Sequence, residues 1–276
     1  MSSKTKPLTT LIFKTLIYGV IREAIAKKIF LGFFIIATLI ILGFLAFINF
    51  DSMDGIVTMM GDNIKELVLG IETSMIVVSN LLLITFCLIS VASIIPSLLE
   101  KGNIDLMLSK PISRGKIILG KFAGGVFLIF LSLVYLIGAV WLILSVKSGY
   151  WNASFLTSIL WLTFSFAVIY SLVIFIGVTT QSSILSIIIN VFLIFLICPI
   201  LYSRETVLFQ FITNDIAQFV INFFYYILPK PDDLRAVSVS IINGEKITSW
   251  QPVITSALFM ITLLSASIFI FKKKDY

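Results

Sequence analysis

The chain has 276 residues, of which 59% are hydrophobic and 12% are charged, and its formal net charge is +6. A soluble domain is about half apolar and about a quarter charged, so this composition, with a mean hydropathy of +1.12, excludes an ordinary soluble protein. In lipid, only helices and closed barrels satisfy every backbone polar group, and we expect an all-α integral membrane protein. Histidine is absent, and Cys87 and Cys198 lie within long apolar runs without metal or disulfide spacing.

The segment before the first long apolar run is basic and amphipathic. Leu8, Ile12 and Leu16 begin an apolar stripe at helical spacing, and Lys14 lies on another side. We expect an N-terminal interfacial amphipathic helix along the inner leaflet; a plain basic anchor for the first span is the alternative. The run from Ile29 is long enough to span and shows no obvious cleavage site, so we expect no cleaved signal peptide.

Six apolar runs are long enough to cross the hydrocarbon core, which takes about 20 residues of helix. None contains Asp, Glu, Lys or Arg, and we expect six transmembrane helices in a single domain over residues 1–276. The predicted spans are residues 29–50, 73–99, 122–146, 155–180, 182–202 and 250–271. The fourth span is separated from the fifth by only a few polar residues around Gln181. This short separation predicts a tight helical hairpin.

Lys and Arg are distributed unevenly between the two sides that these spans define. The N-terminal segment, the loop after the second span and the C-terminus together carry 14 cations and four anions, a net charge of +10. The remaining loops carry six cations and ten anions, a net charge of −4. The basic side is cytoplasmic, so we expect a plasma (inner) membrane protein with both termini in the cytoplasm. The positive net charge thus reports topology and indicates no nucleic-acid partner.

Residues 205–228 are apolar enough to resemble a seventh span, but polar residues recur in them every four positions. These residues are Gln210, Asn214, Gln218 and Asn222. They predict a polar stripe along a helix, and a seventh span would also place the C-terminal lysines outside. We expect an outer re-entrant or amphipathic segment that ends at Pro229 and Pro231.

The sequence carries little catalytic machinery. Ion-coupled transporters usually have ionisable residues within the membrane, and the six predicted spans have none. Without histidine, a Ser–His dyad and His-based metal sites are excluded, which leaves only loop carboxylates for an enzyme. We expect a transport subunit without a catalytic, cofactor-binding or metal site of its own.

Residues 115–121 read G-K-I-I-L-G-K and match the first part of a phosphate-binding loop. The next residue is Phe122, where such a loop needs Ser or Thr for magnesium, and no strand precedes the segment. We predict no nucleotide site here and expect Gly120 and Gly124 to allow close helix packing. The sequon Asn152-Ala153-Ser154 lies on the predicted outer side, but it is a match of only three residues.

The loop after the second span predicts a short charged amphipathic helix on the cytoplasmic face. Ser97 and Glu100 have the spacing of a capping box, and Lys110-Pro111 ends the helix because the residue before proline is pushed away from helical geometry. Ser113 can then cap the third span. Such a helix suits docking into a groove of a soluble partner; an ordinary solvated turn helix is the alternative.

The stretch from Glu100 to Arg114 reads E-K-G-N-I-D-L-M-L-S-K-P-I-S-R and continues to L-G-K-F at residues 119–122. It resembles the signature of ABC-2-type transporter permeases, in which a Glu, a Gly, an amphipathic "LELLLS" run, a Pro and "S-R" precede "LGK" and the third span. The six spans, the basic interfacial helix, the outer segment and the basic C-terminus are similar to that family as well. Asn103 and Asp105 stand where the family often has Thr and Glu.

The resemblance implies a permease half that forms a homodimer or related heterodimer and binds two cytoplasmic ABC ATPase subunits. ATP and magnesium would bind in those partner subunits, and this chain would bind no cofactor itself. The coupling helix of the family matches residues 97–109. The docking residues that we expect are Glu100, Asp105, Leu106, Met107, Leu108 and Arg114.

Three functions remain open at this point. The first is the permease subunit of an ATP-driven ABC transporter, which we expect to be an exporter. The second is the membrane component of an ABC-like complex that does maturation, cargo-delivery or mechanical work with an extracytoplasmic partner at residues 204–251. The third is a scaffold without an ATPase, against which only the resemblance argues.

The substrate does not follow from the sequence. Buried polar residues between helices are more often packing contacts than ligands, although the uncharged spans favour lipid-like or amphiphilic cargo over free ions. The polar candidates within and beside the spans are Asn80, Thr85, Ser90, Ser93, Gln181 and Asn190.

Overall fold

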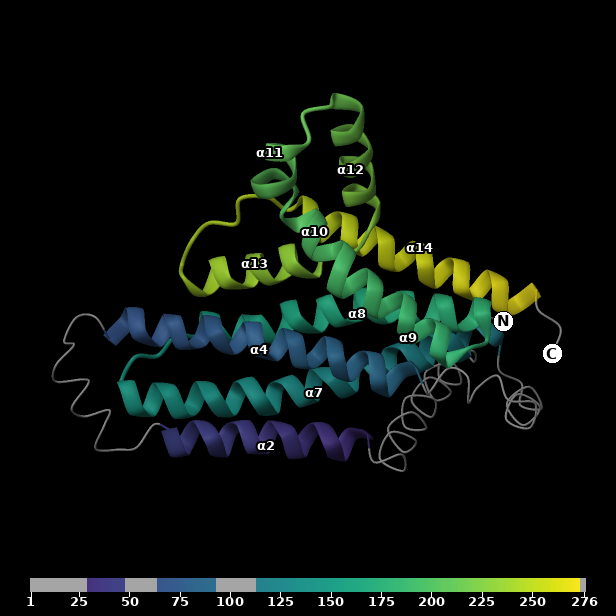
Figure 1. Ribbon diagram of the computed structural model, residues 1–276. Helices are drawn as coiled ribbons and strands as arrows, with labels where there is room; N and C mark the ends of the chain where they lie inside the picture. The colour runs from purple at the N-terminus through teal and green to yellow at the C-terminus, as the bar shows by residue number, and fades with distance from the viewer. Residues whose placement is uncertain (1–28, 48–63, 93–112, 274–276) are drawn as a thin grey trace, which may run out of the picture.

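The computed structural model describes residues 29–47, 64–92 and 113–273, and of residues 29–31, 47, 83–92, 114 and 183 it describes only the backbone. In these ranges the chain forms helices joined by short connections, and it has no strand (Figure 1). The first helices are α2 (Ile29–Phe47), α4 (Ile64–Ala92), α7 (Arg114–Ser148), α8 (Ser154–Thr180) and α9 (Ser183–Phe192). They are followed by η2 (Leu193–Ile197), α10 (Cys198–Tyr202), η3 (Arg204–Leu208), α11 (Phe209–Phe211), α12 (Asp215–Ile227), α13 (Pro231–Ile242) and α14 (Gln251–Lys273). The predicted interfacial and coupling helices fall outside the described residues.

Helix α8 forms the centre of the bundle. It packs against α4, α7, α9, α13 and α14, and most of its residues are buried. It carries no charged residue, and its buried hydroxyls donate within the helix, as Ser158 Oγ does to Phe155 O (2.6 Å) and Ser171 Oγ to Val168 O (2.7 Å). A helix that is apolar all round is buried by other helices, which explains its central place.

The connection between α7 and α8 is short and firmly held. Gly149 ends α7 with φ 71°, a left-handed conformation that glycine adopts without strain, and its N–H donates to Ser145 O (3.0 Å). Trp141 Nε1 then donates to Asn152 O (3.0 Å). The two helices therefore run antiparallel and side by side (Figure 1).

The connection between α8 and α9 is the tight hairpin that the sequence predicts. Gln181 ends α8 with φ 55°, and its N–H donates to Gly177 O (2.9 Å). Ser182 caps α9, because its side chain accepts the N–H of Leu185 (3.3 Å). The fourth and fifth predicted spans are thus separate helices with a turn of two residues between them.

The fifth predicted span is helical from Ser183 to Tyr202, but it widens into a π turn at Leu193–Ile197. Pro199 has no N–H and cannot donate to the carbonyl of Phe195, four residues earlier. The Cys198 N–H instead donates to Leu193 O, five residues back. Single π turns are often found at functional sites, and this one borders the cavity described below.

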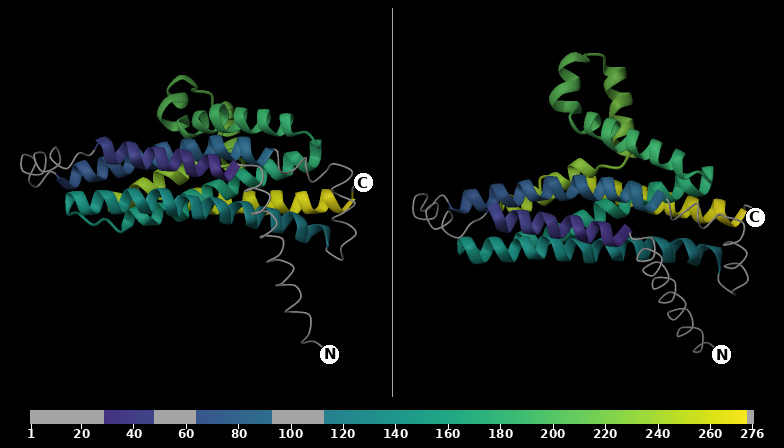
Figure 2. Two further views of the ribbon diagram at one scale, coloured as in Figure 1. Left: turned by 90° about the horizontal axis from the view of Figure 1, so that it is seen from below. Right: turned by 60° about the horizontal axis from the view of Figure 1, so that its bottom comes forward.

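Residues 203–228 form a helical hairpin that stands off the side of the bundle, which we call the outer hairpin (Figures 1 and 2). The single polar stripe predicted for this segment is wrong, because the chain turns at Ile212–Asn214 between α11 and α12. Asn214 caps α12 by accepting the N–H of Ile216 (2.9 Å), and Gln218 Nε2 donates to Ile212 O (2.7 Å). The four-residue spacing of the polar side chains therefore reflects a cap and a turn. Helix α12 does end before Pro229, as expected.

Helix α13 was not anticipated from the sequence. It lies beside the bundle and packs against α4, α8 and α10. Pro231 occupies its first turn together with Asp232 and Asp233, which is a favourable start for a helix because proline is preorganised there and carboxylates complement the helix dipole. Helix α14 then returns along α8 and α7.

Four described helices are long and apolar enough to cross a membrane: Gly115–Ser148, Ser154–Thr180, Ile184–Tyr202 and Gln251–Lys273. A shorter apolar helical stretch covers Gly32–Ala46. The second predicted span begins at residue 73, whereas α4 begins at Ile64 and so includes three charged residues, Lys65, Glu66 and Glu72. The count of six spans stays a prediction.

Candidate functional site

The predicted ATPase-docking residues fall in a part of the chain that the structure describes only at its edges. Glu100, Asp105, Leu106, Met107 and Leu108 lie outside the described residues, and Arg114 is described by its backbone as the first residue of α7. Ser113 occupies the N-cap position as predicted, but its side chain makes no capping hydrogen bond. Its carbonyl instead accepts the N–H of Lys116 (2.9 Å). The docking assignment thus stays a prediction, and the helices around it can be examined.

The start of α7 packs closely on the end of α14. A Cβ built on Gly115 would lie 3.2 Å from Ile268 Cγ2 and 3.9 Å from Lys272 Cε, so a larger residue would require the Ile268 side chain to shift by a few tenths of an ångström. Lys116 lies in the same first turn, and Lys273 ends α14. The structure therefore brings two of the sequence's basic regions together at one end of the bundle (Figure 1).

The stretch that resembles a phosphate-binding loop, residues 115–121, lies inside α7. Its backbone N–H groups are therefore part of a helix and not of a loop that can wrap a phosphate. One turn further on, a Cβ at Gly125 would overlap the ring of Tyr170 on α8. Tyr170 is fully buried, and its hydroxyl donates to Lys121 O (3.3 Å). A glycine does allow close packing in this region, at Gly125; close packing at Gly120 and Gly124 stays a prediction.

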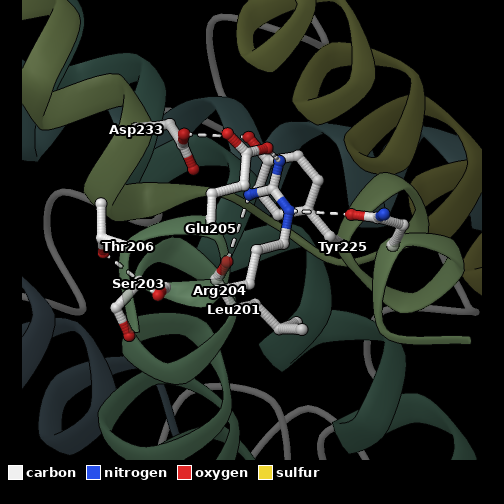
Figure 3. Close-up of polar contacts among 8 residues, drawn as sticks. Leu201, Ser203, Arg204, Glu205, Thr206, Tyr225 and Asp233 are labelled. Atoms are coloured by element: carbon white, nitrogen blue, oxygen red, sulfur yellow. Dashed lines mark hydrogen bonds and ion pairs between the residues drawn. The ribbon is translucent and has the colours of Figure 1, made fainter. Parts of the chain in front are cut away.

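A cluster of buried charged and aromatic side chains joins the outer hairpin to α13 and α14; we call it the outer polar cluster (Arg204, Asn222, Tyr225, Lys230 and Asp233). The Arg204 guanidinium lies over the Tyr225 ring, 3.3 Å from its centroid. Its Nε donates to Asn222 Oδ1 (3.0 Å). Figure 3 shows the Arg204 side chain beside Tyr225, and its Nη1 donates to Leu201 O at the end of α10 (3.2 Å).

The same cluster holds a second cation and a carboxylate. Tyr225 Oη donates to Asp233 Oδ1 (2.9 Å), and Lys230 Nζ donates to Thr255 Oγ1 on α14 (2.8 Å). Lys230 is only 3% exposed and lies 4.6 Å from the centroid of the Tyr225 ring. Buried cations need such partners because removing a charge from water is costly. The cluster therefore fixes the hairpin, α13 and α14 to one another.

Burial shifts the titration of these groups. Loss of hydration lowers the pKa of Lys230 to about 8, with the negative charge of Asp233 opposing the shift. Burial also raises the pKa of Asp233, against the hydrogen bond from Tyr225, and it raises the pKa of Tyr225 together with the charge of Asp233. The tyrosine thus stays protonated and donates to the carboxylate. This pattern of paired and hydrogen-bonded groups suits a structural joint.

A second polar junction joins three elements that are distant in sequence. Asn152 Nδ2, in the α7–α8 connection, donates to Glu72 Oε2 on α4 (2.6 Å) and to Ile242 O at the end of α13 (3.3 Å). Glu72 is 1% exposed, and burial raises its pKa to about 7, with the hydrogen bond from Asn152 opposing the shift. It lies just before the predicted second span. Because Nδ2 of Asn152 is buried and engaged, the sequon is closed to modification in the folded chain.

Sequence reasoning missed most of these residues. It used Pro229 and Pro231 only as the end of a helix, although Pro231 followed by two acids is also a start signal. The partners of Glu72 and Arg204 leave no local signal, since Asn152 lies 80 residues from Glu72 and Asn222 lies 18 residues from Arg204. In the described ranges, no group of three metal-ligating side chains is found.

Comparison with known families gives one match over almost the whole chain. A family model described as ABC-2 family transporter protein matches residues 21–276. No curated protein matches the chain. The match covers every described helix and extends through residues 93–112, where the sequence resemblance is centred. The chain therefore belongs to the ABC-2 transporter family and is a multi-pass membrane protein of the permease type.

Proposed function

We propose that this chain is the permease subunit of an ATP-driven exporter and that two separate ATPase subunits dock on residues 97–109 and Arg114. Family membership over residues 21–276 is the observation that carries the proposal. Permeases of this family work in a membrane with ATPase subunits and are generally not catalytic themselves. ATP and magnesium would bind in the partners. Residues 115–121, which resemble part of a phosphate-binding loop, are helical, and this supports placing the ATP site in another subunit.

The packing around α7 supports a path for mechanical coupling. Helix α7 has 35 residues, and at 1.5 Å per residue it is about 50 Å long. Its first turn contacts α14 at Gly115, and further along it contacts α8 through Lys121 and Gly125. A displacement of residues 97–109 by a closing ATPase pair would therefore move α7 and, through these close contacts, α8 and α14.

Co-purification tests the docking proposal. The full chain is isolated from its native cell in a mild detergent, its partners are identified by mass spectrometry, and ATPase activity is measured. We expect a soluble subunit with a phosphate-binding loop to co-purify with the wild-type chain and to be lost with Glu100→Lys. Glu66→Lys is the matched control, because Glu66 is exposed at the other end of α4.

Two results would contradict the proposal: no nucleotide-binding partner with the wild-type chain, or full partner recovery and transport with Glu100→Lys. The export direction has its own readout, because small molecules that leave through this complex should accumulate inside cells that carry Glu100→Lys. Equal or lower cellular contents in the variant would argue against export. Two permease copies per complex, measured by native mass spectrometry, would support the dimer.

A second candidate, the assembly or mechanical complex with an extracytoplasmic partner, is favoured by the outer hairpin. Its exposed surface is apolar: Phe211 is 80% exposed, and Ile216 and Phe219 are exposed as well. Large exposed apolar patches mark interaction surfaces or lipid contacts. A stable extracytoplasmic protein that co-purifies with the wild-type chain and is lost with Phe219→Ser would favour this candidate.

A further inference from the structure

A cavity of about 150 Å³ lies where α4, the π turn with α10, and α13 meet, and we call it the α4–α13 cavity. Val77, Asn80 and Leu81 line it from one face of α4, since they are spaced by three and four residues. The remaining lining residues come from the other two elements. They are Ile194, Phe195, Pro199, Pro231, Asp232 and Arg235.

The local structure explains why the helices leave space here. Pro199 interrupts the regular hydrogen bonds of its helix, and the π turn at Leu193–Ile197 adds a residue to that turn. Ile194 and Phe195 belong to the widened turn, and Pro231 begins α13 opposite it. Two prolines and a π turn thus keep the walls of the cavity apart.

Asn80 gives the cavity an unpaired polar group. The residue is 5% exposed overall, no hydrogen bond of its amide is found among the described residues, and its amide atoms are not among the fully buried side-chain atoms that lack a partner. Asn80 lines the cavity, where water or a ligand can hydrogen-bond its amide. The volume equals that of about five water molecules, which is enough for a small polar head group.

The opposite wall carries an ion pair. Arg235 Nη2 lies 3.2 Å from Asp232 Oδ1 in the first turn of α13, and the two side chains are 28% and 17% exposed. Their charges cancel, and so do those of the neighbouring Lys230 and Asp233. A ligand with one net charge would compete with one member of the pair and leave the other with no partner at a partly buried site, which is costly.

The mouth of the cavity is apolar. Val77, Leu81 and Phe195 are all large exposed hydrophobic residues, and they line the cavity together with the polar groups. A ligand that fills the cavity with a polar head can therefore extend an alkyl chain over these three side chains. An amphiphile fits a cavity with polar groups inside and apolar side chains at its mouth better than a fully polar solute does.

We propose that the α4–α13 cavity binds the head group of a zwitterionic amphiphile. Its cationic group lies against Asp232, its anionic group lies against Arg235, and the Asn80 amide hydrogen-bonds the anionic end. The alkyl chain follows Val77, Leu81 and Phe195. The site does not depend on ATP coupling, because every contact comes from this chain, and binding can be measured on the permease alone.

Native mass spectrometry of the full-length chain in a maltoside detergent tests the site. The probes share one palmitoyl chain: zwitterionic lysophosphatidylcholine, anionic lysophosphatidic acid and uncharged monopalmitoylglycerol. We expect one saturable lysophosphatidylcholine per chain and binding at least tenfold weaker for the other two. Equal binding of the three probes would overturn the proposal.

Substitutions locate the binding. Asn80→Leu keeps the side-chain size without the amide, and Arg235→Gln removes the cation; each should weaken lysophosphatidylcholine binding at least tenfold. Asn190→Leu is the control, because Asn190 is also buried but does not line the cavity. Undiminished binding by both Asn80→Leu and Arg235→Gln would overturn the site.

A stability readout separates loss of binding from loss of folding. Thermal unfolding is followed through Cys198, which is buried and reacts with a thiol dye when the chain unfolds, in a Cys87→Ala background. Lysophosphatidylcholine should raise the melting temperature of the wild-type chain and of Asn190→Leu, and leave that of Asn80→Leu unchanged. An equal rise in Asn80→Leu would contradict the assignment.

Discussion

The central helix α8 and the outer polar cluster are both buried, yet different physics stabilises each. Helix α8 has no charged residue and is held by shape, as in the fit of Tyr170 against Gly125. The outer polar cluster is built from charges and is held by specific pairs, as in Arg204 over Tyr225. Helices within lipid gain little from the hydrophobic effect against one another and rely on close packing. The comparison teaches that a single permease can use packing along its spans and paired charges at its outer segment.

The largest effect is expected from breaking the cluster. Arg204→Met keeps the length and apolar part of the side chain but removes the stacked cation and its hydrogen bonds to Asn222 and Leu201. Removing one member of a buried charged network typically costs about 3–5 kcal/mol. We expect a loss of about 3 kcal/mol, measured by thermal or denaturant unfolding through Cys198 in the Cys87→Ala background.

Glu205→Gln is the control for that experiment. Glu205 accepts from Arg204 Nη2 (2.6 Å), but its side chain is 69% exposed, and exposed ion pairs contribute only about 0–1 kcal/mol. If Glu205→Gln cost as much as Arg204→Met, the stability of the cluster would reside in its surface ion pair and the comparison would fail.

A smaller effect is expected from disturbing the packing of α8. In Gly125→Ala the new Cβ would overlap the Tyr170 ring, and overpacking typically costs about 1–3 kcal/mol. At Gly138, which lies on α7 as Gly125 does, a new Cβ would meet nothing within 4 Å. Gly138→Ala should therefore be neutral or stabilising by up to about 1 kcal/mol, because alanine favours helix. Equal unfolding temperatures for the two variants would show that α8 does not depend on this contact.

The most subtle test uses Glu72, where α4, the α7–α8 connection and α13 meet. Its pKa is raised from 4.5 to about 7 by burial, so the folded chain binds more protons than the unfolded chain between these values. The contribution of Glu72 to stability is therefore present below about pH 4.5 and is lost as the pH rises through 7. Glu72→Gln should match the wild-type chain at pH 4.5 and be more stable at pH 8.

The exposed Glu66 on the same helix supplies the control for this pH dependence. Glu66→Gln should follow the wild-type unfolding temperature at both pH values. If Glu72→Gln kept the full pH dependence of the wild-type chain, the Glu72 carboxyl would not be the titrating group. The pH dependence of stability would then not distinguish the polar junctions from the packing of α8.

The sequence alone determined the helical membrane class, the approximate ends of several helices and the tight turn at Gln181. These features depend on local properties: the length of an apolar run, the need to satisfy the backbone in lipid, and caps such as Ser182. The predicted fourth span, residues 155–180, differs from α8 by a single residue at its start. The family resemblance around residues 100–114 also came from local sequence, and the match over residues 21–276 agrees with it.

Only the tertiary structure decided the outer hairpin, α13, the outer polar cluster and the Glu72–Asn152 junction. The predicted polar stripe failed because a spacing of four residues cannot distinguish one helix from a cap and a turn. The partners in the polar junctions are separated by as many as 90 residues, as are Asn152 and Ile242. No local pattern encodes such pairs, because they are selected when the helices pack and each buried polar group must find a partner. Asn80, which lines a cavity and has no such partner among the described residues, could be recognised only once its neighbours were in place.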